Sequence, residues 1–183
     1  MKSLTFAAGM AVLVLPISIA NAGIITVGDG FARSCYDASE AQVATPQNIE
    51  ACDRAFSEQA LDFHDEVATH VNRGILFYLR GELAAANRDY DQALTLDPNE
   101  PEAWLNKGMA ALKARDRTAA APMFEKALAL KTVRPALAYY GRAIVNEDFG
   151  NIRGAYADLQ RARDLEPRWP LPAEELKRYV VRE

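Results

Sequence analysis

The sequence predicts an all-α protein built from repeated pairs of helices. Three observations carry this prediction. Small and aromatic residues recur with a period of about 34 positions between residues 67 and 167. Segments with a helical spacing of apolar residues are separated by short breaks rich in Pro, Asp and Asn, such as residues 97–101. Half of the 183 residues are hydrophobic and a quarter are charged, so the chain has enough apolar surface to bury a core.

The charge balance bears on the class of partner. The formal net charge is −4, and the sequence contains no long block of Lys or Arg. Binding to the phosphates of a nucleic acid requires a positively charged surface. We therefore expect no nucleic acid partner.

The first 22 residues have the pattern of an export signal. Lys2 gives a positive start, and residues 4–19 are uncharged and mostly apolar. Ala20 and Ala22 supply small residues at the two positions that a signal peptidase recognises. An uncleaved anchor is the alternative, but the apolar stretch is short for a membrane span of about 20 residues. We predict cleavage after Ala22, no stable membrane insertion afterwards, and a periplasmic or secreted location.

The chain has two cysteines, Cys35 and Cys52, and both follow the predicted cleavage position. An even number of cysteines in an exported chain favours one disulfide. Two separately buried thiols are one alternative. A thiol-redox enzyme or sensor that uses this pair is another, although the close spacing of a Cys-x-x-Cys motif is absent.

The 34-residue period is carried by four pairs of small or aromatic residues. They are Gly74 and Gly108, Ala86 and Ala120, Tyr90 and Phe124, and Ala93 and Ala127. Three residues of a third copy follow 35 positions after the second: Ala155, Leu159 and Ala162. This pattern resembles the tetratricopeptide repeat family, which places Gly, Ala, aromatic residues and Pro at such offsets. The sequence departs from the family pattern where the family has Leu before the first Gly: Arg73 and Lys107 stand there.

The resemblance implies a right-handed α-solenoid of about three helix pairs, at residues 67–100, 101–134 and 135–167. We expect helices near residues 65–80, 83–96, 101–114, 117–130, 135–147, 152–165 and 172–182. Residues 23–66 are expected to form a degenerate opening pair, clipped by the disulfide, in which Thr45 caps the second helix. Residues 168–183 are expected to cap the other end with a helix that has Leu176, Tyr179 and Val180 on one face.

The third copy contains an irregularity. With Gly141 aligned to Gly108, its two helices are separated by two extra residues. We expect these residues near 146–150, where they would lengthen the turn between the two helices.

The resemblance also suggests a binding site. In this family the first helix of each pair lines a concave groove, and Asn residues there bind the backbone of an extended peptide. Asn72 and Asn106 stand at matching positions, and Tyr139 takes the third; a side-chain amide offers both the donor and the acceptor that a peptide unit needs. The alternative is that Asn72 and Asn106 only brace adjacent helices. The other expected groove residues are Ile75, Tyr78, Leu79, Met109, Lys113, Arg142 and Asn146.

Motifs for catalysis, cofactors and metals are absent from the sequence. The two histidines, His64 and His70, are six positions apart and do not share a helix face. We expect no catalytic residue, cofactor or metal, and we expect His70 to pack in the core. The leading hypothesis is an exported, non-catalytic scaffold that binds a protein or peptide segment, with cell-envelope assembly as its setting. The alternatives are the thiol-redox function and self-association through an end of the array.

Overall fold

The computed structural model describes residues 3–6, 23–24 and 30–182 of the chain. The chain divides into two compact units. The first unit comprises residues 20–133, and the second comprises residues 1–19 and 134–183. Among the described residues, no helix combines the length and the apolar character needed to cross a membrane.

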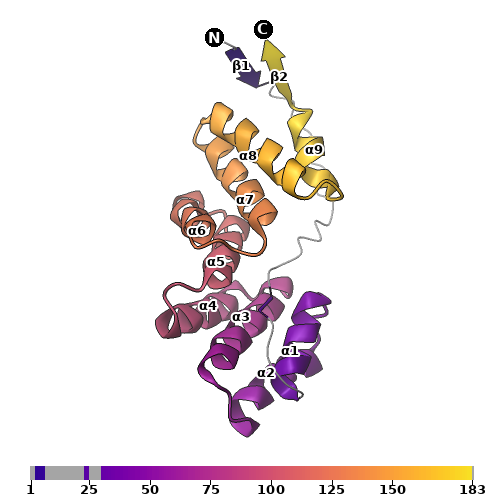
Figure 1. The fold of residues 1–183 in the computed structure, drawn as a ribbon, viewed down its shortest axis with the longest axis vertical. Coiled ribbons are helices and arrows are strands. Elements are labelled where there is room, and N and C mark those ends of the chain that lie inside the picture. Colours follow the sequence, from indigo (N-terminus) through magenta and orange to yellow (C-terminus); the bar gives the residue numbers. More distant parts are fainter. Residues whose placement is uncertain (1–2, 7–22, 25–29, 183) are drawn as a thin grey trace. The chain divides into compact units, whose positions relative to one another are not determined.

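Consecutive helices pair within each unit. In the first unit α1 packs on α2, α3 on α4 and α5 on α6, and in the second unit α7 packs on α8 (Figure 1). This confirms the predicted all-α repeat fold, to which the described residues add one pair of short strands. The elements are β1 (Ser3–Phe6), α1 (Phe31–Glu40), α2 (Pro46–Glu58), α3 (Phe63–Leu79), α4 (Leu83–Leu96), α5 (Pro101–Lys113), α6 (Arg117–Ala129), α7 (Pro135–Asp148), α8 (Ile152–Leu165), α9 (Pro170–Leu176) and β2 (Tyr179–Arg182).

Local sequence signals account for where the helices begin. The Thr45 hydroxyl accepts a hydrogen bond from the Asn48 N–H at 3.2 Å, and Pro46 takes the first helical position of α2. Asp62 caps α3 in the same way, with its carboxylate 2.8 Å from the Asp65 nitrogen. Each cap satisfies a backbone N–H that has no partner within its own helix.

Three helix pairs are closed by turns of the same length. Each turn has three residues, and its middle residue has a positive φ: 82° at Gly81, 63° at Arg115 and 75° at Gly150. In all three turns, each of the three turn residues also donates its backbone N–H to a carbonyl oxygen near the end of the first helix. The expected lengthening of the third turn is therefore wrong. Helix α7 is longer than α5 by one residue, since it has 14 residues and α5 has 13.

This shared turn corrects the register of the third copy. Asn72 and Asn106 each lie eight positions before the first residue of the turn that follows them. In the third copy Gly141 takes this position, and Tyr139 takes the position of Trp104. The alignment of Gly141 with Gly108 misplaced the third copy by two positions. The third helix pair has no amide at the position of Asn72.

Small residues let the helices of a pair approach closely. A Cβ atom on Gly74 would lie 2.4 Å from Cε1 of Tyr90, and one on Gly108 would lie 2.9 Å from the equivalent atom of Phe124. Both aromatic side chains are fully buried. Glycine is therefore required at both positions by the ring that packs against it.

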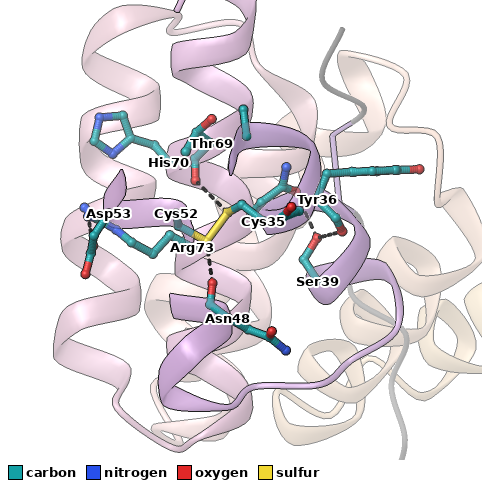
Figure 2. The surroundings of a disulfide bond; sticks show 12 residues. Cys35, Tyr36, Ser39, Asn48, Cys52, Asp53, Thr69, His70 and Arg73 are labelled. Atoms are coloured by element: carbon teal, nitrogen blue, oxygen red, sulfur yellow. Dashed lines mark hydrogen bonds and ion pairs between the residues drawn. A yellow bond between two sulfur atoms is a disulfide. The ribbon is translucent and has the colours of Figure 1, made fainter. Parts of the chain in front are cut away.

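In the first unit, a disulfide joins α1 to α2. Cys35 and Cys52 form it with their Cα atoms 4.9 Å apart, and both residues are fully buried. Figure 2 shows the bond lying between the two helices, beside Thr69 of α3. Leu76 of α3 packs on the same cluster. The opening pair is thus tied internally and also contacts the first full repeat.

The C-terminal segment differs from its prediction. Helix α9 ends at Leu176, and β2 pairs with β1 in an antiparallel register that places Ser3 opposite Arg182. The expected helix face of Leu176, Tyr179 and Val180 is therefore wrong. Tyr and Val favour strands, and a partner strand is present to accept them. Since β1 lies inside the predicted signal peptide, cleavage after Ala22 would remove this partner from β2.

The disulfide provides a test of how the opening pair is stabilised. Replacing Cys35 and Cys52 by Ala together should lower the free energy of unfolding by about 3 kcal/mol, because the link closes a separation of 17 residues. Urea denaturation of the chain beginning at Gly23 would measure the change. A reductant should destabilise the unmodified protein by the same amount and leave the double variant unaffected. Equal stability of the oxidised protein and the double variant would contradict a stabilising role.

Candidate peptide-binding surface

The Asn72 amide binds a peptide backbone in this structure. Its Oδ1 accepts the N–H of Ile24 at 2.9 Å, and its Nδ2 donates to the carbonyl oxygen of Ile24 at 2.8 Å. The side chain lies on α3 and is fully buried. This is the paired donor and acceptor arrangement that suits an amide facing a peptide unit. The bound segment belongs to the chain itself.

Asn72 also braces a neighbouring helix. Ser39, a buried residue of α1, donates its hydroxyl hydrogen to the Asn72 Oδ1 at 3.1 Å. The same hydroxyl lies 2.8 Å from the Tyr36 carbonyl oxygen, as Figure 2 shows. The two roles considered for Asn72, backbone binding and helix bracing, are therefore present together.

Asn106 contacts its own helix. Its Nδ2 donates to the Glu102 carbonyl oxygen at 2.9 Å, one turn earlier in α5. The buried Glu102 carboxylate in turn accepts hydrogen bonds from the Thr132 hydroxyl at 2.8 Å and from the Val133 N–H at 2.7 Å. Glu102 therefore holds the segment that follows α6, and Asn106 bonds to the backbone of Glu102.

The apolar residues of the predicted groove in the first unit differ in accessibility. Ile75 and Met109 are buried and fill the core, while Leu79 is half-buried.

Lys113 donates to the Tyr78 carbonyl oxygen at 2.8 Å, and its ammonium lies 4.3 Å from the centroid of the Tyr78 ring. Burial lowers the pKa of Lys113 and raises that of Tyr78.

The remaining predicted residues lie in the second unit, where they contact one another and α8. Arg142 donates to both carboxylate oxygens of Asp158 at 2.8 Å, and Asn146 donates to Asp158 at 3.0 Å. Tyr139 has its ring centroid 5.3 Å from the Arg142 guanidinium and 5.4 Å from that of Arg161. These side chains connect α7 to α8.

A charge network around the buried Asp89 was not predicted from the sequence. Arg73 donates to the two oxygens of Asp89 at 2.9 and 2.6 Å and to Asp53 at 2.6 Å. Its guanidinium lies 4.6 Å from the Phe56 ring centroid. His70, also in contact with Phe56, has Nδ1 3.1 Å from Asp89 (Figure 2 shows Arg73 and His70). Arg73 therefore takes the family's Leu position because it pairs with a carboxylate on the facing helix.

The same pairing recurs in the second unit. Arg142 and Asp158 have the sequence separation of Arg73 and Asp89, 16 residues, and they bond in the same bidentate manner. An Arg followed by an Asp at this separation in two copies is a signal that the sequence contains. It could have been found with the corrected register of the third copy.

Two family models match this chain. One described as TPR repeat matches residues 74–113, and one described as tetratricopeptide repeat matches residues 105–170. The chain belongs to the tetratricopeptide repeat family. No curated protein matches it.

Solved structures of tetratricopeptide repeat proteins share the fold. The crystal structure of MamA is 19% identical with a TM-score of 0.62, and the match covers 82% of each chain. The first repeat domain of Spaghetti (RPAP3), bound to the HSP90 peptide SRMEEVD, is 21% identical with a TM-score of 0.57, covering 61% of this chain and 88% of that one. The Arabidopsis OM64 domain is 20% identical with a TM-score of 0.57, covering 63% and 98%. At these identities the similarity establishes the fold.

One group of ligand-type side chains lies at the start of α3. Donor atoms of Asp62, His64 and Asp65 lie within 4.8 Å of one another. Asp62 and His64 are exposed, and Asp62 caps the helix through the Asp65 N–H. Capping explains the position of Asp62 without a metal ion.

The Arg73 and Asp89 pair predicts a dependence of stability on pH. Burial raises the pKa of Asp89, but hydrogen bonds from His70 and Arg73 outweigh it, so the pKa lies below its ordinary value of 3.8. A lowered pKa in the folded state means that the contribution of Asp89 is complete above that value and is lost as the pH falls below it. Asp89→Asn should cost about 3 kcal/mol near neutral pH, because it leaves the half-buried Arg73 poorly compensated.

Urea denaturation at several pH values would check this prediction. The difference in unfolding free energy between the unmodified protein and Asp89→Asn should shrink between about pH 5 and pH 2. The matched control is Asp91→Asn, an exposed carboxylate on the same helix, which should change stability by less than about 1 kcal/mol. A difference that does not vary with pH would contradict the assignment.

Proposed function

We propose that this protein is an exported, non-catalytic scaffold that binds an extended segment of another protein at the Asn72 surface. We define the Asn72 surface as Ser39, Val71, Asn72 and Ile75. The single observation that carries the proposal is the pair of hydrogen bonds between the Asn72 amide and the Ile24 backbone. A site that binds one peptide unit in this way is chemically suited to bind another.

The surroundings of Asn72 indicate what such a segment would look like. Ile24 packs its side chain against the apolar cluster that contains Val71, Ile75 and Ala103. The amide recognises the backbone, and the cluster accepts an apolar side chain. The expected ligand is therefore an extended peptide with an apolar anchor. The Spaghetti domain bound to a peptide supports the use of this fold for peptide binding.

Export is supported by two independent features. Residues 1–22 have the order of charge, apolar stretch and small residues that a signal peptidase recognises. The disulfide between Cys35 and Cys52 is the kind of bond that persists in an oxidising compartment. We propose a periplasmic or secreted location, with cell-envelope assembly as the setting.

Burial weighs against the thiol-redox alternative. A redox-active pair must be reached by a reductant or a substrate thiol. Cys35 and Cys52 are both fully buried beneath α3. The disulfide is better suited to hold α1 and α2 together than to exchange with a substrate.

Export can be tested by the mass of the chain recovered from the producing cells. The periplasmic or secreted fraction should contain a chain that begins at Gly23, because Ala20 and Ala22 mark the cleavage position. Intact-mass spectrometry would measure it. Ala22→Asp should leave a longer chain, and the same substitution at Ala41, which lies outside the signal, should not. Recovery of the full chain from the cytoplasm would contradict export.

Partner binding can be tested by capture followed by an affinity measurement. The chain beginning at Gly23 is used to capture proteins from an envelope extract, and each captured protein is then titrated against variants. Asn72→Ala should weaken binding about tenfold, because it removes two hydrogen bonds to the peptide backbone. The matched control is Asn99→Ala, the same truncation at an exposed position between α4 and α5.

The melting temperature of each variant separates lost binding from lost folding. If a folded Asn72→Ala protein binds every captured partner as tightly as the Asn99→Ala protein does, the Asn72 surface is not the binding site. If nothing is captured and the protein instead forms oligomers by light scattering, self-association replaces partner binding.

A further inference from the structure

The residue before Ile24 is also held by a polar group. The backbone nitrogen of Gly23 donates to Oε1 of Glu40 at 3.1 Å. Glu40 is the last residue of α1, and Ser39 beside it bonds to Asn72. Gly23 and Ile24 therefore meet three neighbouring side chains, of which Ser39 and Asn72 are fully buried.

A side chain at the first of these two positions would press against polar side chains. A Cβ atom on Gly23 would lie 2.7 Å from Glu40 Oε1, 2.9 Å from Ser39 Oγ and 3.1 Å from Asn72 Oδ1. Ser39 and Asn72 are hydrogen-bonded to each other, so neither can move aside without breaking that bond. Three oxygen atoms converge on the space beside this residue.

The Glu40 carboxylate beside the Gly23 nitrogen suits a positive charge. Cleavage after Ala22 would turn the Gly23 nitrogen from an amide with one N–H into a primary ammonium with three. An ammonium beside a carboxylate adds the attraction of an ion pair to the hydrogen bond that an amide N–H already donates. Removal of the signal peptide would thus strengthen an interaction whose geometry is already present.

We propose that Glu40 binds the N-terminal ammonium of the processed chain, while Asn72 holds the backbone of Ile24 beside it. Gly23 and Ile24 then occupy the Asn72 surface as an intramolecular ligand. This inference rests on the proposed function, because it uses the proposed cleavage position and the proposed binding site.

The occupied site has a consequence for partner binding. Both polar groups of the Asn72 amide are bonded to Ile24. A partner segment therefore reaches Asn72 only after Gly23 and Ile24 leave. Six residues separate Ile24 from the start of α1 at Phe31, so this ligand is tethered at high effective concentration. The chain's own N-terminus competes with the partner.

The reactivity of the N-terminal amine tests the site directly. A chain made to begin at Gly23 is treated with a limiting amount of an acylating reagent at neutral pH, and the modified N-terminal peptide is quantified by mass spectrometry. Only a neutral, accessible amine reacts, so an ammonium held by Glu40 reacts slowly. Glu40→Gln should speed the modification about fivefold, because it removes the negative charge that pairs with the ammonium and leaves only a hydrogen bond to an amide oxygen.

Two further variants complete the design. Gly23→Ala should also speed the modification, because its methyl group would contact Glu40, Ser39 and Asn72. Glu50→Gln is the matched control, since it neutralises an exposed carboxylate on α2, and it should leave the rate unchanged. Both Glu40 and Glu50 are exposed, so melting temperatures are expected to stay close to that of the unmodified protein.

Results that overturn the ammonium site differ from results that refute the proposed export. Equal rates in the unmodified protein, Glu40→Gln and Glu50→Gln would overturn the site. Protection that grows with protein concentration would also overturn it, because the N-terminus of a second copy would then be the ligand. A chain that proves to be uncleaved in cells would refute export, while the measured rates would still report on the site.

A captured partner would separate the two roles of this surface. Glu40→Gln should strengthen its binding about fivefold, because the competing N-terminus is released more easily. In the Glu40→Gln background, where the N-terminus is held less tightly, adding Asn72→Ala should weaken partner binding, because the partner then loses its own hydrogen bonds to the amide. Unchanged or weaker binding to the folded Glu40→Gln protein would contradict competition by the N-terminus.

Discussion

A buried side-chain amide must have its hydrogen bonds satisfied, and the structure around Asn72 follows from that constraint. Leaving such a group without partners would cost on the order of 1–3 kcal/mol. Ser39 of α1 and the backbone of Ile24 supply the partners. The amide thereby determines where α1 packs on α3 and which segment lies beside it. One residue connects the opening helix pair, the first full repeat and the candidate binding surface.

The other polar groups of the interior follow the same principle. The core consists largely of Ala and of the aliphatic residues Val, Ile and Leu, whose contacts have little directional preference. Arg73 with Asp89, and Arg142 with Asp158, add bidentate bonds between the two helices of a pair. Glu102 with Thr132 holds the segment that follows α6. Each bond has a defined direction, so it selects one alignment of helices that apolar contacts would allow to slide.

The proposed export and the proposed binding both involve the N-terminus of the processed chain. The predicted cleavage position immediately precedes Gly23, whose backbone nitrogen donates to Glu40 beside the Asn72 surface. Processing would therefore create the charged end of an intramolecular ligand and, in the second unit, would remove β1 from its partner β2. The precursor and the processed chain would differ at two places in the fold. A scaffold of this kind would acquire its final surface only after the signal peptide is removed.

The sequence by itself determined the features that depend on local rules. The 34-residue period, the Pro residues and the capping residues located six of the seven helices with predicted bounds to within about two positions, because these signals act on neighbouring residues. Tertiary structure alone decided three further features. The register of the third repeat depended on a turn whose length periodicity could not specify. Residues 179–182 became a strand because a partner strand, distant in the sequence, pairs with them. The segment that binds Asn72 lies 48 residues before it, and no local pattern relates Ile24 to an amide so far along the chain.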